Sequence, residues 1–303
     1  MDQRHPGVVL TFASRPAHWL VLFAPYTWLI IFCAVPIALV MKISLAEPIL
    51  AQPPFTPLFD DSEFGCVRLS FDSYARLGQD EVYISALTNA FRVAGISTVL
   101  CLLIGFPMAY AITRVTPGFR ICLLVLVAVP FWTAFLIRVY AWMGLLGNHG
   151  LINGLLQFMG VTEAPIVLLH TELAVYIGIA YVYLPFMIFP LYVNLSRIDP
   201  MIVDAARDLG ANPIRVFGSV IFPLSLPGVA AGCILVFIPA VGEFVIPTML
   251  GGADSLMIGQ ILWNEFFIAR NWPMACAIAS FLLALIALPV AAFQSITTMG
   301  ARP

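Results

Sequence analysis

Charged side chains are scarce in this chain of 303 residues. Asp, Glu, Lys and Arg make up 10% of it, whereas soluble globular proteins contain about 25%. Lys42 is the only lysine, and it does not follow a glycine as the lysine of a phosphate-binding P-loop must. Nucleotide hydrolysis through a P-loop is therefore excluded. The net charge of −2 and the lack of a basic run predict no nucleic-acid partner.

Cysteine and histidine do not form a recognisable metal or redox motif. The six cysteines include no Cys-x-x-Cys pair, so neither a zinc site nor a disulfide framework is predicted. All but Cys66 lie in apolar runs, and the sequence assigns Cys66 no role. The four histidines lack metal-binding spacing, and no apolar run contains paired carboxylates. We predict no catalytic residue, metal site or cofactor in this chain, and no enzymatic activity.

Hydrophobic residues are abundant, at 61% of the chain with a mean hydropathy of +0.99. Several apolar runs reach the length of about 20 residues that a membrane-spanning helix needs. The first run, at 19–41, is longer than the core of a signal peptide, about 7–15 residues, and is expected to remain as an anchor. We therefore predict an all-α membrane protein with six transmembrane helices.

The order of apolar and polar segments predicts five regions. They are an N-terminal tail at 1–18, a first transmembrane helix at 19–43, a polar periplasmic loop at 44–85, a five-helix core at 86–297 and a C-terminal tail at 298–303. Within the core, spans are expected at about 86–113, 121–141, 172–193, 226–250 and 274–297, with a short amphipathic helix at about 151–159. If both termini lie in the cytoplasm, the cytoplasmic segments contain slightly more arginines than the outer ones. This bias favours that orientation.

The polar stretch 199–227 interrupts the apolar second half and carries clear signals for helix ends. Asp199 is a suitable N-cap and Pro200 a suitable first residue, so a helix is expected at 201–209. Gly210 follows where a left-handed residue commonly ends a helix. Asn212 and Pro213 repeat the start signal. We predict two short helices at an angle, which project from the bilayer.

The residues of this stretch resemble the cytoplasmic coupling loop of ABC-importer permeases. That pattern is Glu-Ala-Ala, three residues, Gly, nine residues, then Ile, any residue and Leu-Pro. The matching residues here are Asp204, Ala205, Ala206, Gly210, Val220, Phe222 and Pro223. The resemblance implies that Asp204, Ala205, Ala206 and Gly210 contact a separate ATPase. The other interpretation is an ordinary amphipathic connector with Ile202, Ala205 and Leu209 on one face.

Three further stretches are similar to the permease subunits of bacterial polyamine importers, at 130–153, 241–267 and 270–279. The resemblance implies a type I ABC-importer permease in the bacterial inner membrane. It also implies a second permease subunit, two copies of a cytoplasmic ATPase that binds ATP and Mg, and a periplasmic substrate-binding protein. The expected substrate is putrescine or spermidine. Relatives that carry thiamine, ferric iron or opines share much of the pattern, so these substrates stay open.

Glu243 is the clearest ionisable residue within an expected span, and such residues are usually functional. Pro239, Gly242 and Pro247 flank it, so we expect a broken helix that lines a cavity. A carboxylate there favours a cationic substrate, unless Glu243 instead pairs with Arg138 or Arg92.

Aromatic and acidic residues near Glu243 are further candidates for the substrate pathway. Rings attract cations through their faces, although Trp and Tyr are also common at membrane interfaces. The candidates are Trp132, Tyr181, Tyr183, Phe244, Trp263 and Glu265. Glu265, Glu172 and Asp254 form either an acidic vestibule or ordinary solvated loops.

Two other functions are compatible with a polytopic membrane protein. A stand-alone secondary carrier usually has paired broken helices in matching halves, and the sequence indicates only the break near Glu243. A membrane-embedded enzyme needs catalytic side chains within the spans, which the sequence lacks.

Overall fold

The computed structural model describes residues 22–23, 25–56, 69–252 and 255–299. Within these residues every regular element is a helix, apart from one isolated bridge between Pro48 and Phe55, which confirms the all-α prediction. Most of the expected terminal tails, together with Cys66 and Asp254, lie outside the described residues. The chain divides into two compact units, and each is described by itself.

Unit 1 comprises the described residues of Met1–Tyr74 and Asn271–Leu285. Its first helix, Pro25–Ser44, includes a π-helical turn, η1 (Ile30–Ala34), followed by α2 (Val35–Ser44). Only 6% of its most apolar stretch is buried within the chain, as expected for a helix that faces lipid or another subunit. The Ser44 hydroxyl fixes its end by bonding to the Met41 carbonyl and to the Tyr74 hydroxyl, at 2.7 and 2.8 Å.

Two further helices begin in unit 1. The short α3 (Asp72–Gln79) lies within the polar loop expected at 44–85. The apolar α14 (Trp272–Met299) covers the last expected span, and Asn271 caps it by accepting a hydrogen bond from the Met274 N–H at 3.3 Å.

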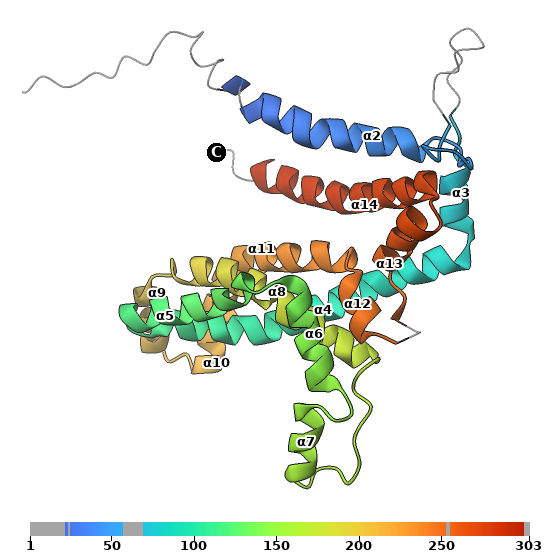
Figure 1. The fold of residues 1–303 in the computed structure, drawn as a ribbon. Helices are drawn as coiled ribbons and strands as arrows, with labels where there is room; N and C mark the ends of the chain where they lie inside the picture. The colour runs from blue at the N-terminus through green and yellow to red at the C-terminus, as the bar shows by residue number, and fades with distance from the viewer. Residues whose placement is uncertain (1–21, 24, 57–68, 253–254, 300–303) are drawn as a thin grey trace, which may run out of the picture. The chain divides into compact units, whose positions relative to one another are not determined.

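Unit 2 comprises the described residues of Ala75–Arg270 and Ile286–Pro303, and three long helices form its core. These are α4 (Glu81–Arg114), α8 (Glu172–Leu195) and α11 (Phe222–Val241), which contact one another pairwise (Figure 1). Small residues let their backbones approach closely. At Gly232, for example, a Cβ atom would lie 2.6 Å from the Met187 sulfur.

The third expected span, at 121–141, is not one straight helix. The structure has α5 (Pro117–Ala128), a 3-10 turn η2 (Val129–Trp132) and then α6 (Phe135–Leu146), with a bend of 95° between the two helical segments. The backbone is extended at Thr133 and Ala134, which interrupts the helical hydrogen bonds. The prediction of a single break, near Glu243, was therefore wrong, because this second break has no comparable glycine and proline signal.

The short helix predicted in the loop after α6 is confirmed as α7 (Leu151–Phe158). The buried Asn153 side chain holds it in place by donating to the carbonyls of Gly147 and Ile166 and accepting from the Ile166 N–H, all within 3.1 Å. The Asn153 side chain therefore ties α7 to the segment before it, at Gly147, and to the segment after it, at Ile166.

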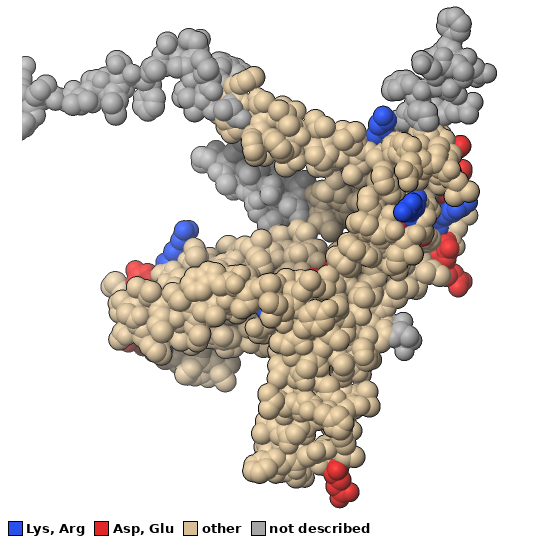
Figure 2. All heavy atoms as spheres, viewed as in Figure 1, with Lys and Arg blue, Asp and Glu red and all other residues tan. Residues whose placement is uncertain are grey.

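Length and hydropathy identify four helices in the described residues that can cross a membrane, or five if the bent pair is one span. In the face seen in Figure 2, uncharged side chains cover most of the helices of unit 2, and charged ones gather near element ends. Such a distribution fits a multi-pass membrane protein.

Candidate functional site

The predicted helix signals of the stretch 199–227 are confirmed. Asp199 accepts a hydrogen bond from the Met201 N–H at 2.9 Å and caps α9 (Pro200–Asp208). Gly210 follows with a φ of +81°, in the left-handed region that glycine adopts most readily. Asn212 then accepts from the Arg215 N–H at 2.8 Å and starts α10 (Pro213–Val216).

The second expected short helix is instead the first part of a long one. After α10 comes a π-helical turn, η3 (Phe217–Ile221), which leads directly into α11. A single helix thus runs over Pro213–Val241, so the span expected at 226–250 begins and ends earlier. The π-helical turn widens the helix just before Pro223, whose ring would otherwise clash with a preceding carbonyl.

The surface of the stretch 199–227 combines two exposed motif side chains with exposed apolar ones. Asp204 and Ala205 are exposed, and Asp204 forms an ion pair with Arg207 at 3.2 Å. Three large apolar side chains beside them are more than three-quarters exposed, namely Met201, Leu209 and Ile214. Val203 and Val216 are buried on the opposite side and attach the stretch to the core of unit 2. Grouped exposed apolar side chains are typical of a protein interface.

The helix break predicted at Glu243 is also confirmed. α11 ends at Val241, and α12 (Val245–Leu250) begins after Phe244. The Glu243 side chain is only 7% exposed. Its Oε1 atom accepts from the backbone N–H groups of Val245 and Ile246, at 3.0 and 3.4 Å, and so caps α12. Its Oε2 atom accepts a 2.6 Å hydrogen bond from the Tyr183 hydroxyl on α8.

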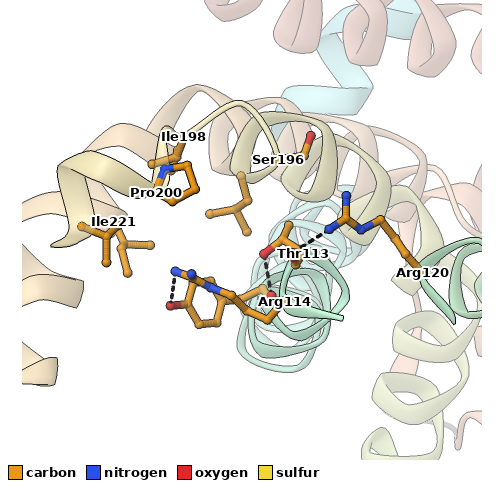
Figure 3. Close-up of a pocket in the computed structure, with 10 residues that line it drawn as sticks. Thr113, Arg114, Arg120, Ser196, Ile198, Pro200 and Ile221 are labelled. Atoms are coloured by element: carbon orange, nitrogen blue, oxygen red, sulfur yellow. Dashed lines mark hydrogen bonds between the residues drawn. The ribbon is translucent and has the colours of Figure 1, made fainter. Parts of the chain in front are cut away.

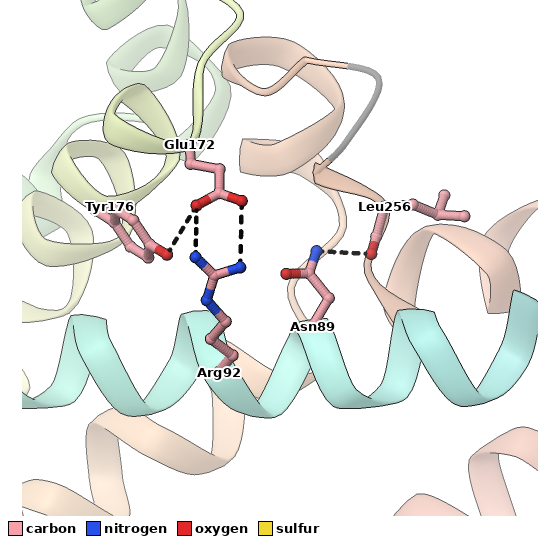
Figure 4. A network of polar contacts seen from close by, with 5 residues as sticks. All are labelled: Asn89, Arg92, Glu172, Tyr176 and Leu256. Atoms are coloured by element: carbon pink, nitrogen blue, oxygen red, sulfur yellow. Dashed lines mark hydrogen bonds and ion pairs between the residues drawn. The ribbon is translucent and has the colours of Figure 1, made fainter.

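The two arginines considered as partners of Glu243 have other contacts. Arg92 forms an ion pair with Glu172 at 3.1 Å, and the Tyr176 hydroxyl donates to the same carboxylate (Figure 4). Arg138 lies over the ring of Phe135, with 5.8 Å from its guanidinium carbon to the ring centre. Among the described residues Glu243 therefore has no arginine within ion-pair distance. Asn89, one turn before Arg92, donates to the Leu256 carbonyl at 2.9 Å.

The structure brings some of the predicted aromatic residues together. Phe244, next to Glu243, stacks on Trp263 with ring centres 4.6 Å apart and planes at 12°. Phe267, which the sequence did not single out, extends this stack at 4.1 Å from Trp263. Glu265 accepts a 2.9 Å hydrogen bond from the Tyr83 hydroxyl. Glu243, Tyr183, Phe244 and Trp263 thus form a connected group, which we call the Glu243 cluster.

Three predicted pathway residues lie outside the Glu243 cluster, namely Glu265, Tyr181 and Trp132. Tyr181 packs against Trp142 at 5.4 Å, and Trp132 is 80% exposed at the bend between α5 and α6. A polar link that the sequence analysis missed joins α12 to α13 (Ile258–Trp263), where Gln260 donates to the Thr248 hydroxyl at 3.1 Å. In the sequence, the only signal for this link was the amide side chain of Gln260 within an apolar run.

Comparison with known proteins supplies a family. Residues 101–296 match the family described as binding-protein-dependent transport system inner membrane component. A spermidine/putrescine transport system permease protein, PotB of Haemophilus influenzae, is 41% identical over 263 residues, which cover 87% of this chain and 88% of that protein.

Two solved structures share the fold at 17% identity, and both concern bacterial alginate import. One, of an ABC transporter for that acidic polysaccharide, has a TM-score of 0.67 and covers 94% of this chain and 96% of its own. The other, in complex with an alginate-bound periplasmic protein, has a TM-score of 0.65 and covers 90% of each chain. This chain therefore belongs to the family of inner membrane components of binding-protein-dependent transport systems.

Proposed function

We propose that this chain is a permease subunit of an ATP-driven importer and forms half of the pathway for a polyamine, putrescine or spermidine. The observation that carries the proposal is the identity of 41% over most of the chain to a spermidine/putrescine permease. The local chemistry is consistent with a cationic substrate, because a buried carboxylate and stacked rings form the Glu243 cluster.

The proposed assembly contains this chain, a second permease subunit, two ATPase subunits that bind ATP and Mg, and a periplasmic binding protein. In it, the chain has six spans, both termini lie in the cytoplasm, and the stretch 199–227 faces the ATPase. The exposed apolar side chains of Met201, Leu209 and Ile214 support an interface there. The alginate transporter, solved with a periplasmic protein, supports a binding-protein partner.

The continuous helix Pro213–Val241 suggests how the ATPase drives transport. Its 29 residues span about 43 Å at 1.5 Å per residue. One end adjoins Gly210 and Asn212, and the other leads into Gly242 and Glu243. A force that the ATPase applies at α9 would therefore reach the Glu243 cluster through the turn at Gly210 and one continuous helix. In this mechanism the chain does no covalent chemistry and couples two distant sites.

Asp204, Ala205, Ala206 and Gly210 carry the coupling in this proposal. Ala205 is exposed, and its small side chain allows another protein to approach the α9 backbone closely, whereas Ala206 packs against the core of unit 2. Gly210 sets the turn between α9 and α10. In the substrate pathway we retain the Glu243 cluster with Glu265, and we leave out Tyr181 and Trp132.

Co-purification from native membranes, combined with uptake, tests the proposed function. We expect an ATPase subunit and a second permease to co-purify with the tagged chain in stoichiometric amounts. Radiolabelled putrescine uptake should need ATP, and unlabelled spermidine should compete while thiamine and ferric iron do not. Uptake by the chain alone, driven by an ion gradient, would instead identify a secondary carrier. Competition by thiamine or iron alone would reassign the substrate.

A further inference from the structure

A polar cavity of about 170 Å³ lies between the ends of α4 and α8, the first turn of α5 and the start of α9 (Figure 3). Its polar lining includes Arg114, Arg120 and Ser196, and α9 contributes Pro200 and Val203. No acidic side chain lines it. Since about 10–15 Å³ of such volume holds one water molecule, the cavity has room for a tetrahedral anion.

Both arginines are held in place by neighbouring groups. The Arg114 guanidinium lies 4.8 Å above the ring centre of Tyr110 and donates to its hydroxyl at 2.8 Å. Arg120 donates through one terminal nitrogen to the carbonyls of Thr113 and Val115, at 2.9 and 3.3 Å. Neither guanidinium has an acidic partner among the described residues. Two positive charges are thus fixed at one cavity without neutralisation.

The role of Arg120 in capping α4 does not account for all of its donors. A guanidinium has five N–H groups in a planar fork, which matches the oxygen spacing of a phosphate. The hydrogen bonds to Thr113 and Val115 both use one terminal nitrogen of Arg120, which leaves its other terminal nitrogen as a donor for an anion in the cavity.

We propose that this cavity binds a phosphate group, held by Arg114 and Arg120. Basic pockets between membrane helices commonly bind the headgroups of acidic lipids, so an anionic phospholipid or a free phosphate is the source of the group. The cavity wall formed by Pro200 and Val203 belongs to α9. A phosphate group bound in the cavity would therefore hold α9 in place against α4 and α8. That consequence rests on the proposed coupling function, whereas the binding itself does not.

The test uses the full-length chain in a neutral detergent, with phosphatidylglycerol or inorganic phosphate as the probe. We expect phosphatidylglycerol to be retained in native mass spectrometry and its affinity to fall at least about tenfold in the double variant R114Q/R120Q, because charge-assisted hydrogen bonds are lost. R197Q is the matched control, since Arg197 lies near Ser196 in sequence but does not line the cavity. It should bind like the wild type.

The two sources of the phosphate group give different results in thermal unfolding. A lipid site predicts that phosphatidylglycerol, and not inorganic phosphate, raises the unfolding midpoint of the wild type. A free-anion site predicts that inorganic phosphate raises it without lipid. Equal binding of both probes by the wild type and R114Q/R120Q would overturn the proposal.

Because R114Q/R120Q also removes the cap of α4, Arg114→Gln provides a second variant. It removes one of the two positive charges and leaves the hydrogen bonds of Arg120 to the end of α4 in place, so it should weaken binding while it stays monodisperse. Unchanged affinity for both probes in Arg114→Gln would contradict the proposal. Co-purification of the ATPase is scored separately. If the chain binds the phosphate probe but no ATPase co-purifies, the phosphate site is supported and the proposed function is contradicted.

Discussion

Substitution of Gly210 by phenylalanine should abolish polyamine uptake while the protein still inserts into the membrane. Gly210 has a φ of +81°, and a Cβ atom there would meet no other atom of the chain within 4 Å. The added Cβ atom therefore meets no clash, and the backbone cost is the left-handed penalty of about 1–2 kcal/mol. The bulky ring instead projects from the surface that we assign to the ATPase. We expect uptake to fall more than about tenfold.

Gly160 provides the matched control for this prediction. It also has a positive φ, of +69°, and a Cβ atom there would likewise meet nothing within 4 Å. It follows α7, in a different part of unit 2. Gly160→Phe should therefore retain uptake at similar abundance in membranes. Equal loss of uptake in both variants would assign the effect to backbone strain, and normal uptake in Gly210→Phe would count against the coupling role.

Glu243→Gln should reduce putrescine uptake at least about tenfold, because an interaction with a charged group contributes about 1.5–3 kcal/mol. Glutamine has nearly the same shape, and its carbonyl oxygen can still accept from the N–H groups of Val245 and Ile246. The variant thus removes the charge and keeps the cap of α12. Initial rates of uptake and the abundance of the protein in membranes are the two measurements.

Two controls separate the charge of Glu243 from its structural role. Tyr183→Phe removes the hydroxyl that donates to Glu243 but keeps the carboxylate, so we expect a smaller loss of uptake. Glu163→Gln removes an exposed carboxylate in the loop after α7 and should have no effect. If Glu243→Gln transports at the wild-type rate, Glu243 only caps α12 and lies outside the substrate pathway.

The features that the sequence predicted well are local ones. Asp199, Gly210 and Asn212 act within a few residues of their own position, and each has the conformation or hydrogen bond expected for its residue type. The break at Glu243 is also local, since Pro239, Gly242 and Pro247 surround it. For these elements the residues next in sequence determine the backbone conformation.

The predictions that failed depended on contacts far apart in the sequence or on backbone adjustments. The helix that starts at Pro213 was predicted to be short, yet the π-helical turn at Phe217–Ile221 lets it continue into α11. The bend after Trp132 has only Pro130 nearby as a signal. Composition alone did not reveal either feature.

The contacts of Glu243 illustrate the same limit within the candidate site. Its partner Tyr183 is 60 residues away, and the sequence offered Tyr183 only as an aromatic ring. The charge partner of Arg92 proved to be Glu172, on another helix. Residue types identified these positions, but only the packing of α4, α8 and α12 determines which of them meet.

Photo-crosslinking from Leu209 tests the central claim, that the stretch 199–227 contacts a separate ATPase. Leu209 and Phe158 are both 89% exposed, so a photoreactive amino acid at either position is equally accessible. We predict that position 209 forms an adduct with the ATPase in native membranes and that position 158 does not. Adducts from position 158 alone, or labelling of position 209 by a reagent confined to the periplasm, would contradict the account.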